Sequence, residues 1–222
     1  MRVKDIVESG SKDDVLKILK QYEDSLIKLA SEIRQSKPND EKHFLLYNLT
    51  VCSANQLKGL RLVYDLPTEF YAWIARNLFE LNLTVRYILS SPENLVKFGS
   101  KRARDEIEML KGMLKFEEMD EDMAKTIESR IDRLNQSAEK HKRILKERLS
   151  INELLKESTN MQREYNIFYK LYSKYVHPTS WLVNGPQDVI YSSEIRNTCL
   201  VNAQLYAGNI AKLILDETEI SI

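Results

Sequence analysis

Two charged residues interrupt the most apolar segment of the chain. Arg76 and Glu80 stand four residues apart within residues 66–89, so on a helix they share one face. On or near this face lie Glu69, Trp73, Leu83 and Tyr87. A charge in a core helix is costly unless it is paired and hydrogen-bonded. The pair is therefore either a buried structural ion pair or part of a polar pocket inside a helical bundle, to which Tyr87 would contribute.

A second group of polar residues ends the tyrosine-rich segment 161–176. Tyr169, Ser173 and His177 recur at four-residue steps, Tyr172 lies beside them, and Pro178 stops the helix. A histidine at a helix C-terminus is favoured as a cation by the helix dipole. These residues form either a core stripe with a capping histidine, or a set of hydroxyls and an imidazole that faces Arg76 and Glu80.

Other kinds of chemistry have little support in the sequence. The three histidines are dispersed, and no pair of them has the spacing of metal ligands, so we expect no metal and no cofactor. The sequence has no glycine-rich phosphate loop, no nucleophile elbow and no Cys-x-x-Cys. Cys52 and Cys199 are expected to be small core residues rather than nucleophiles.

The elements that position these residues are predicted to be helices throughout. The 222 residues include 6 Gly and 5 Pro, too few for the many turns of a β-sandwich, barrel or Rossmann unit. Helical periodicity predicts an amphipathic helix that ends at 36–40 and carries Val15, Leu16, Leu19, Leu26, Leu29 and Ile33. A second helix is predicted over about 41–64, with a stripe of Leu45, Leu49, Cys52, Gln56 and Leu60. Further helices are predicted over about 67–90, 161–176 and 190–216, with a loop over 178–189. The fold class is therefore all-α, an up-and-down helical bundle.

The segment 101–149 differs from the rest in composition. Phe116 is its only aromatic residue, charge is dense, and short heptad seams precede and follow an acidic turn at 117–122. We interpret it as a projecting antiparallel helical hairpin inserted into one body formed by residues 1–100 and 150–222. His141 lies on the second seam within a basic run over 140–148, interpreted as a solvated face.

The two polar groups together resemble a known family. Arg76-x-x-x-Glu80, followed by Tyr169-x-x-x-Ser173-x-x-x-His177-Pro178, is similar to an uncharacterised all-helical bacterial family catalogued as a domain of unknown function. The resemblance covers roughly residues 40–215, with the hairpin as a variable insertion. It implies a helical fold and a shared polar site, without a reaction.

A more distant resemblance is to the HEPN superfamily of helical bundles, many of which are RNases of toxin and phage-defence systems. Those enzymes carry an Arg-x(4–6)-His motif on a late helix, whereas here no arginine precedes His177 at that spacing. Arg76 would have to take the arginine's place from another helix.

Two functions remain open from the sequence. One is a HEPN-like defence or toxin protein that cleaves RNA without a metal, with His177 as general acid/base and Arg76 holding the phosphate. Glu80 would orient Arg76, while Tyr169 and Ser173 would shape the pocket. The other is a non-catalytic scaffold that binds a protein partner through the hairpin 101–149.

Charge and hydropathy limit the kinds of partner and compartment that the sequence allows. Lys plus Arg and Asp plus Glu number 33 each, which excludes a broadly basic nucleic-acid binder but not a local basic site. The apolar segment 66–89 carries too many charges for a membrane span. We expect a cytoplasmic protein without a membrane partner, and the heptad seams favour a homodimer.

Overall fold

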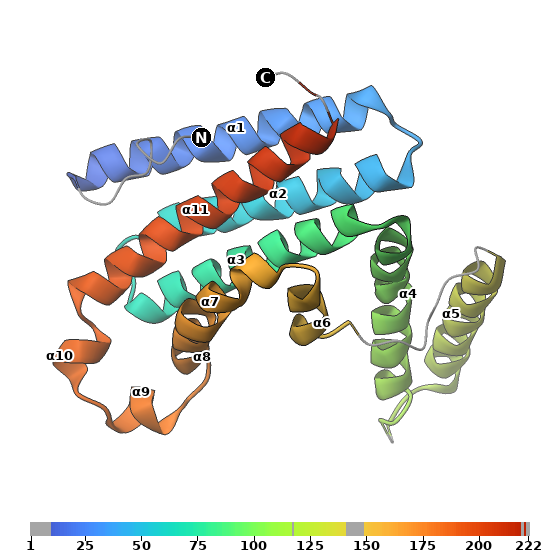
Figure 1. The fold of residues 1–222 in the computed structure, drawn as a ribbon. Helices are drawn as coiled ribbons and strands as arrows, with labels where there is room; N and C mark the ends of the chain where they lie inside the picture. Colours follow the sequence, from blue (N-terminus) through green and yellow to red (C-terminus); the bar gives the residue numbers. More distant parts are fainter. Residues whose placement is uncertain (1–9, 117, 141–148, 219, 221–222) are drawn as a thin grey trace. The chain divides into compact units, whose positions relative to one another are not determined.

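The computed structural model of the chain describes residues 10–116, 118–140, 149–218 and 220, and every regular element among them is a helix (Figure 1). The prediction of an all-α fold is therefore confirmed. The chain divides into two compact units. The first combines the described residues up to Arg86 with those from Leu155 onward, and the second spans Tyr87–Leu154. The body and hairpin boundaries expected from the sequence stay a prediction.

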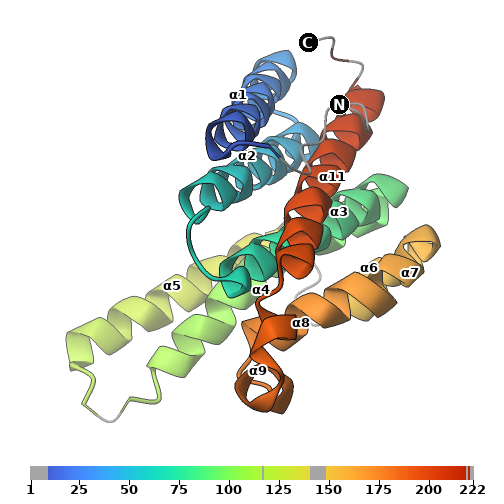
Figure 2. The same ribbon diagram turned by 90° about the vertical axis from the view of Figure 1, so that its left-hand side faces the viewer.

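Two long antiparallel helices begin the first unit. α1 (Lys12–Ser36) is capped by the Ser11 hydroxyl, which accepts from the Asp14 N–H, and α2 (Glu41–Leu62) is capped by Asp40 in the same way. α1 and α2 lie side by side along their length (Figure 2). Apolar residues at helical spacing on α1 form the buried seam between them: Val15, Leu19, Leu26, Leu29 and Ile33.

Two more long helices complete the core of this unit. α3 (Thr68–Ser90) and α11 (Ser193–Thr218) join through the Asn82 side chain, whose nitrogen donates to the carbonyl of Tyr206 at 3.3 Å. The rings of Phe79 and Tyr206 meet edge to face at 5.3 Å. α3 buries most of its apolar side chains, as expected for a helix that is apolar on most sides.

The segment before α11 is built from short helical pieces. These are α6 (Ile151–Lys156), a 3-10 turn η2 (Thr159–Met161), α7 (Gln162–Glu164), a π-helical turn η3 (Tyr165–Tyr169), α8 (Lys170–Val176), α9 (Ser180–Asn184) and α10 (Gln187–Ile190). The predicted loop over 178–189 therefore contains two short helices. Thr179 caps α9 by accepting from the Leu182 N–H, a local bond that hydrophobic periodicity does not reveal.

The second unit contains a helical hairpin. α4 (Pro92–Met113) and α5 (Glu121–Lys140) pack through Ile107, Ile127 and Ile131, and an ion pair joins Arg130 to Glu106. The helix that contains the first arm begins at Pro92, and the Ser91 hydroxyl caps it by accepting from the Asn94 N–H. His141 and the rest of the basic run as far as Arg148 lie outside the described residues.

Candidate functional site

Four residues of the first unit meet at one side of α3. Arg76 donates through Nε to Glu80 Oε1 at 3.2 Å and through Nη2 to the Tyr169 hydroxyl at 3.0 Å. Its Nη1 lies 3.2 Å from Nε2 of His177, which is 101 residues away in sequence. The Tyr169 hydroxyl in turn donates to Glu80 Oε1 at 2.9 Å. We call these four residues the Arg76 cluster.

A π-helical turn directs Tyr169 toward the arginine. In η3 the N–H of Lys170 bonds to the carbonyls of Tyr165, five residues earlier, and Ile167, three residues earlier, whereas an α-helix uses the carbonyl four residues earlier. The rings of Tyr165 and Tyr169 stack at 5.1 Å, and the Tyr169 ring also packs at 5.4 Å against Phe79 of α3. The guanidinium lies 5.0 Å from the centroid of the Tyr169 ring, a cation–π contact. This packing fixes the ring, so its hydroxyl reaches Arg76 and Glu80 together.

His177 reaches the cluster because α8 ends one residue before it. Its backbone is extended, as expected before Pro178, and its carbonyl accepts from the Thr179 N–H at 2.7 Å. The side chain is exposed. A guanidinium only donates hydrogen bonds, so Nε2 is the acceptor in the contact with Arg76.

The electrostatics of the cluster are set by the ion pair of Arg76 and Glu80 and by the partly buried phenol of Tyr169. Partial burial by itself would lower the pKa of Arg76, but the bonds and charges of Tyr169 and Glu80 outweigh it and raise this pKa. Burial, together with the Glu80 carboxylate, raises the pKa of Tyr169. The side chains of Arg76 and Glu80 are 20% and 42% exposed, so this ion pair is not sealed in the core.

The other predicted pocket residues do not join these contacts. The Ser173 hydroxyl donates to the Tyr169 carbonyl at 2.9 Å, a bond within its own helical segment. Tyr172 is completely buried, and its hydroxyl accepts from the Asn202 side chain of α11 at 2.8 Å, so it is a core residue. Tyr87 is buried and belongs to the second unit, whereas the cluster is built from the first unit alone.

A comparison with family models identifies the fold region that carries the cluster. A model described as a family of unknown function matches residues 72–185, half of the chain. The chain belongs to this family, DUF5677. The resemblance to an all-helical family of unknown function is thereby confirmed, and the matched range includes all four residues of the cluster. No curated protein and no solved structure matches the chain.

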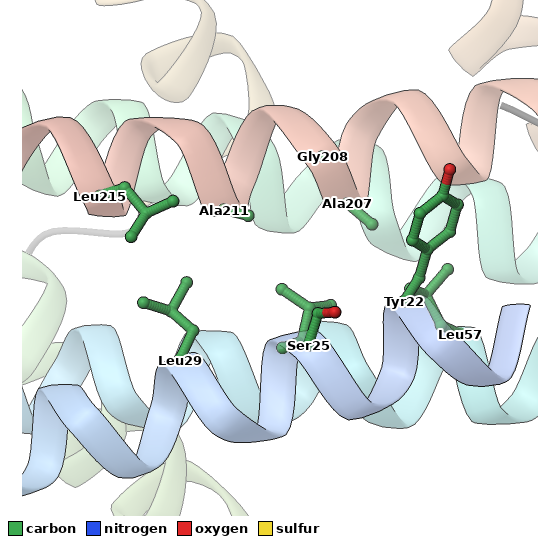
Figure 3. Close-up of a pocket in the computed structure, with 9 residues that line it drawn as sticks. Tyr22, Ser25, Leu29, Leu57, Ala207, Gly208, Ala211 and Leu215 are labelled. Atoms are coloured by element: carbon green, nitrogen blue, oxygen red, sulfur yellow. The ribbon is translucent and has the colours of Figure 1, made fainter. Parts of the chain in front are cut away.

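An apolar cavity of about 190 Å³ lies elsewhere in the first unit, between α1 and α11 with Leu57 of α2 at its base (Figure 3). Small residues of α11, Ala207, Gly208 and Ala211, form one wall. The cavity offers mostly carbon atoms to a ligand, so it has no evident acid–base chemistry. Among the residues that line it, Tyr22 and Ser25 carry hydroxyls.

A second arginine–tyrosine cluster was not found from the sequence. Arg196 of α11 donates to the Tyr71 hydroxyl at 2.7 Å and to the Tyr64 carbonyl, and its guanidinium lies over both rings. No spacing rule could have indicated this contact, because its members come from different elements. These contacts bring no histidine and no carboxylate to Arg196, so we assign the Arg196 cluster a structural role.

Within the described ranges, no group of three or more His, Cys, Asp and Glu side chains is arranged to hold a metal ion. Among the helices described, none combines the length and the apolar character that crossing a bilayer requires. Cys199 is buried, as expected, but Cys52 is exposed on α2, so its assignment to the core was wrong.

Proposed function

We propose that the Arg76 cluster binds a phosphodiester of RNA and cleaves it without a metal ion. His177 is the general base and Arg76 holds the phosphate. The observation that carries the proposal is the contact of 3.2 Å between Arg76 Nη1 and His177 Nε2. This contact places a guanidinium, which binds phosphate through directed hydrogen bonds, beside an exposed imidazole that can accept a proton.

The chemistry requires an exchange of hydrogen-bond partners. A phosphate oxygen replaces Nε2 as the acceptor from Arg76 Nη1, which frees Nε2 to take the proton of the ribose 2′-hydroxyl. The O2′–P bond then forms and the P–O5′ bond breaks. The leaving O5′ takes a proton from water, and the imidazolium of His177 gives its proton to the hydroxide that remains. Arg76 stabilises the charge that develops on the phosphoryl oxygens.

Glu80 and Tyr169 act on the arginine rather than on the substrate. Glu80 accepts from Nε of Arg76, Tyr169 accepts from Nη2, and His177 lies against Nη1. Three of the five N–H groups of Arg76 therefore have a partner in the cluster. Glu80 also offsets the positive charge of Arg76. Phosphate binding therefore depends on directed N–H donors at the exposed edge of the guanidinium, more than on net charge.

The test is digestion of a single-stranded RNA by the purified chain in excess EDTA. His177→Ala is expected to lower the rate by about 10²- to 10⁴-fold, the usual contribution of a general base. Arg76→Lys is expected to lower it by about 10²- to 10³-fold, because an ammonium cannot make the same directed contacts. His177→Gln separates loss of the base from loss of side-chain volume.

The matched control is Arg163→Ala, which removes an exposed arginine of α7 for which no contact is described. It should leave the cleavage rate unchanged. A thermal melt accompanies each variant, because an arginine variant that unpairs Glu80 is expected to be less stable. Cleavage that is equal in the wild type and in His177→Ala, or that disappears with EDTA, contradicts the proposal.

A second candidate function is a scaffold that binds a protein partner through the hairpin. It is supported by large apolar side chains that are exposed where α4 ends and α5 begins: Met109, Met113, Phe116 and Met123. Phe116 is 70% exposed. Flexible methionines beside an aromatic ring are typical of surfaces that bind other proteins.

This candidate is tested by cross-linking in cells, through Lys111 and Lys115 beside the exposed side chains. A scaffold predicts cross-links to one defined protein that are lost in Phe116→Asp, together with no RNA cleavage by the pure chain. Light scattering of the purified protein tests the expected homodimer. A monomer that forms no specific cross-links would exclude the scaffold.

A further inference from the structure

An exposed tryptophan lies one helical turn before the arginine of the cluster. Trp73 is 50% exposed on α3, although tryptophan is a large apolar residue that is highly buried on average. The other tryptophan, Trp181, packs edge to face on Tyr175 at 5.2 Å. One indole therefore has a packing role, and the other offers its surface to solvent.

On α3, Trp73 lies between two residues that contact the segment 177–191. Glu69, Trp73, Arg76 and Glu80 follow a 4-3-4 spacing, so they form one stripe along the helix. Glu69 accepts from the Tyr191 hydroxyl at 2.7 Å, and Arg76 contacts His177. The segment 177–191 thus contacts α3 at its first residue, through Arg76, and at its last residue, through Glu69. Trp73 lies between these two contacts and stays exposed.

We propose that Trp73 is the base-stacking residue of the Arg76 cluster, and that the substrate is RNA with an unpaired base. This inference rests on the proposed function. Residues three apart on a helix have Cβ atoms about 5–6 Å from each other, a spacing comparable to that between a base and its phosphate within one nucleotide. A base stacked on the indole places its phosphate beside Arg76 and His177.

The chemistry of this surface favours a single strand. Stacking needs a free face of the base, which a duplex does not offer, and aromatic side chains beside cationic groups are the usual platform for unpaired nucleotides. Phe70, also exposed, lies three residues before Trp73 on the same helix. Indole stacking accepts any base, so the site is expected to select for lack of pairing more than for sequence.

The test uses the intrinsic fluorescence of Trp73. The chain has two tryptophans, so Trp181→Phe leaves Trp73 as the only tryptophan, and excitation at the red edge of the indole band avoids emission from the 11 tyrosines. His177→Ala in the same protein prevents cleavage during the titration. A 12-mer of uridylate is expected to quench this emission saturably. An abasic 12-mer with the same phosphates, and a duplex RNA, should not quench it.

Direct binding measurements give the size of the effect. In the His177→Ala background, Trp73→Ala should raise the Kd for oligouridylate by roughly 5- to 150-fold. Phe116→Ala removes another exposed aromatic ring and should leave the Kd unchanged. A thermal melt of Trp73→Ala accompanies the titration, because the buried half of the indole contributes to stability.

The outcomes separate this inference from the proposed function. If the wild type cleaves RNA but Trp73→Ala binds oligouridylate as tightly as its parent, the stacking role is wrong and the cleavage proposal stands. Equal quenching by the abasic oligomer, or by duplex RNA, also overturns the stacking role. If the chain neither binds oligouridylate nor cleaves RNA, both fail together.

Discussion

Removal of a single hydroxyl group tests how the Arg76 cluster is held. Tyr169→Phe keeps the ring, and with it the stack on Tyr165 and the contact with Phe79. It deletes an oxygen that accepts from Arg76 at 3.0 Å and donates to Glu80 at 2.9 Å. Both bonds involve a charged partner, so each belongs to the stronger class of protein hydrogen bonds.

The magnitude follows from these two bonds and their exposure. Hydrogen bonds to charged groups contribute about 1.5–3 kcal/mol each when they are buried, which would give an upper bound of about 3–6 kcal/mol. Water can replace part of this, because the Arg76 and Glu80 side chains are 20% and 42% exposed and keep the bond between them. We therefore expect a loss of about 1–2 kcal/mol in the free energy of unfolding.

Chemical denaturation measures this loss directly, and a thermal melt should show a decrease of about 2–8 °C for a chain of this length. The matched control is Tyr165→Phe, which deletes a hydroxyl of the same segment for which no hydrogen bond is described, and should change stability by less than about 0.5 kcal/mol. RNA cleavage should also fall in Tyr169→Phe, because Arg76 loses the acceptor at Nη2. Equal stability of the two variants would refute the assigned role of the Tyr169 hydroxyl.

Three further predictions concern the rest of the first unit. Hydrogen bonds from the side chain and backbone of His43 hold the pKa of Asp40 below its usual range. The stability that these bonds give the folded protein is therefore present above about pH 3.9 and is lost as the pH falls through the folded-state pKa of Asp40. The advantage of the wild type over Asp40→Asn, measured by urea unfolding, should therefore shrink on acidification; a constant difference would contradict the pairing. Burial raises the pKa of Cys199 to about 12, so a thiol reagent should modify only the exposed Cys52 in the native protein and both cysteines in denaturant; two fast native thiols would be inconsistent with this burial. Gly208→Ala adds a methyl group to the wall of the apolar cavity and improves helix propensity, so the melting temperature should rise by up to about 4 °C, and a decrease would show that the wall is already closely packed.

The long helices were accessible to sequence analysis because their periodicity is local. On α1 five of the six predicted apolar residues are buried, Val15, Leu19, Leu26, Leu29 and Ile33, and Leu16 is partly buried. α2 was less accessible, since Leu49 and Leu60 of the predicted stripe are buried but Cys52 is exposed, and Ser53 and Leu57 beside the stripe are buried. α2 contacts both α1 and α11, so its buried face is broad and no single stripe defines it.

Features with short or unusual geometry were not predictable in the same way. The π-helical turn at Tyr165–Tyr169 depends on bonds between residues five apart, which carry no hydrophobic pattern. The helices α9 and α10 span 5 and 4 residues, too few for a period of 3.6 to be recognised. The Arg196 cluster combines three elements that the sequence does not relate to one another.

The sequence alone determined that Arg76 and Glu80 share a face, because four residues make about one helical turn, and that a helix ends at His177, because Pro178 follows it. Tertiary structure alone decided that these groups meet. The approach of His177 to Arg76 depends on how the segment from Tyr165 to His177 packs on α3, and no local spacing encodes a contact across 101 residues. The exposure of Trp73 was decided at the same level, because a helix that is apolar on most sides does not reveal which of its side chains the neighbouring helices leave uncovered.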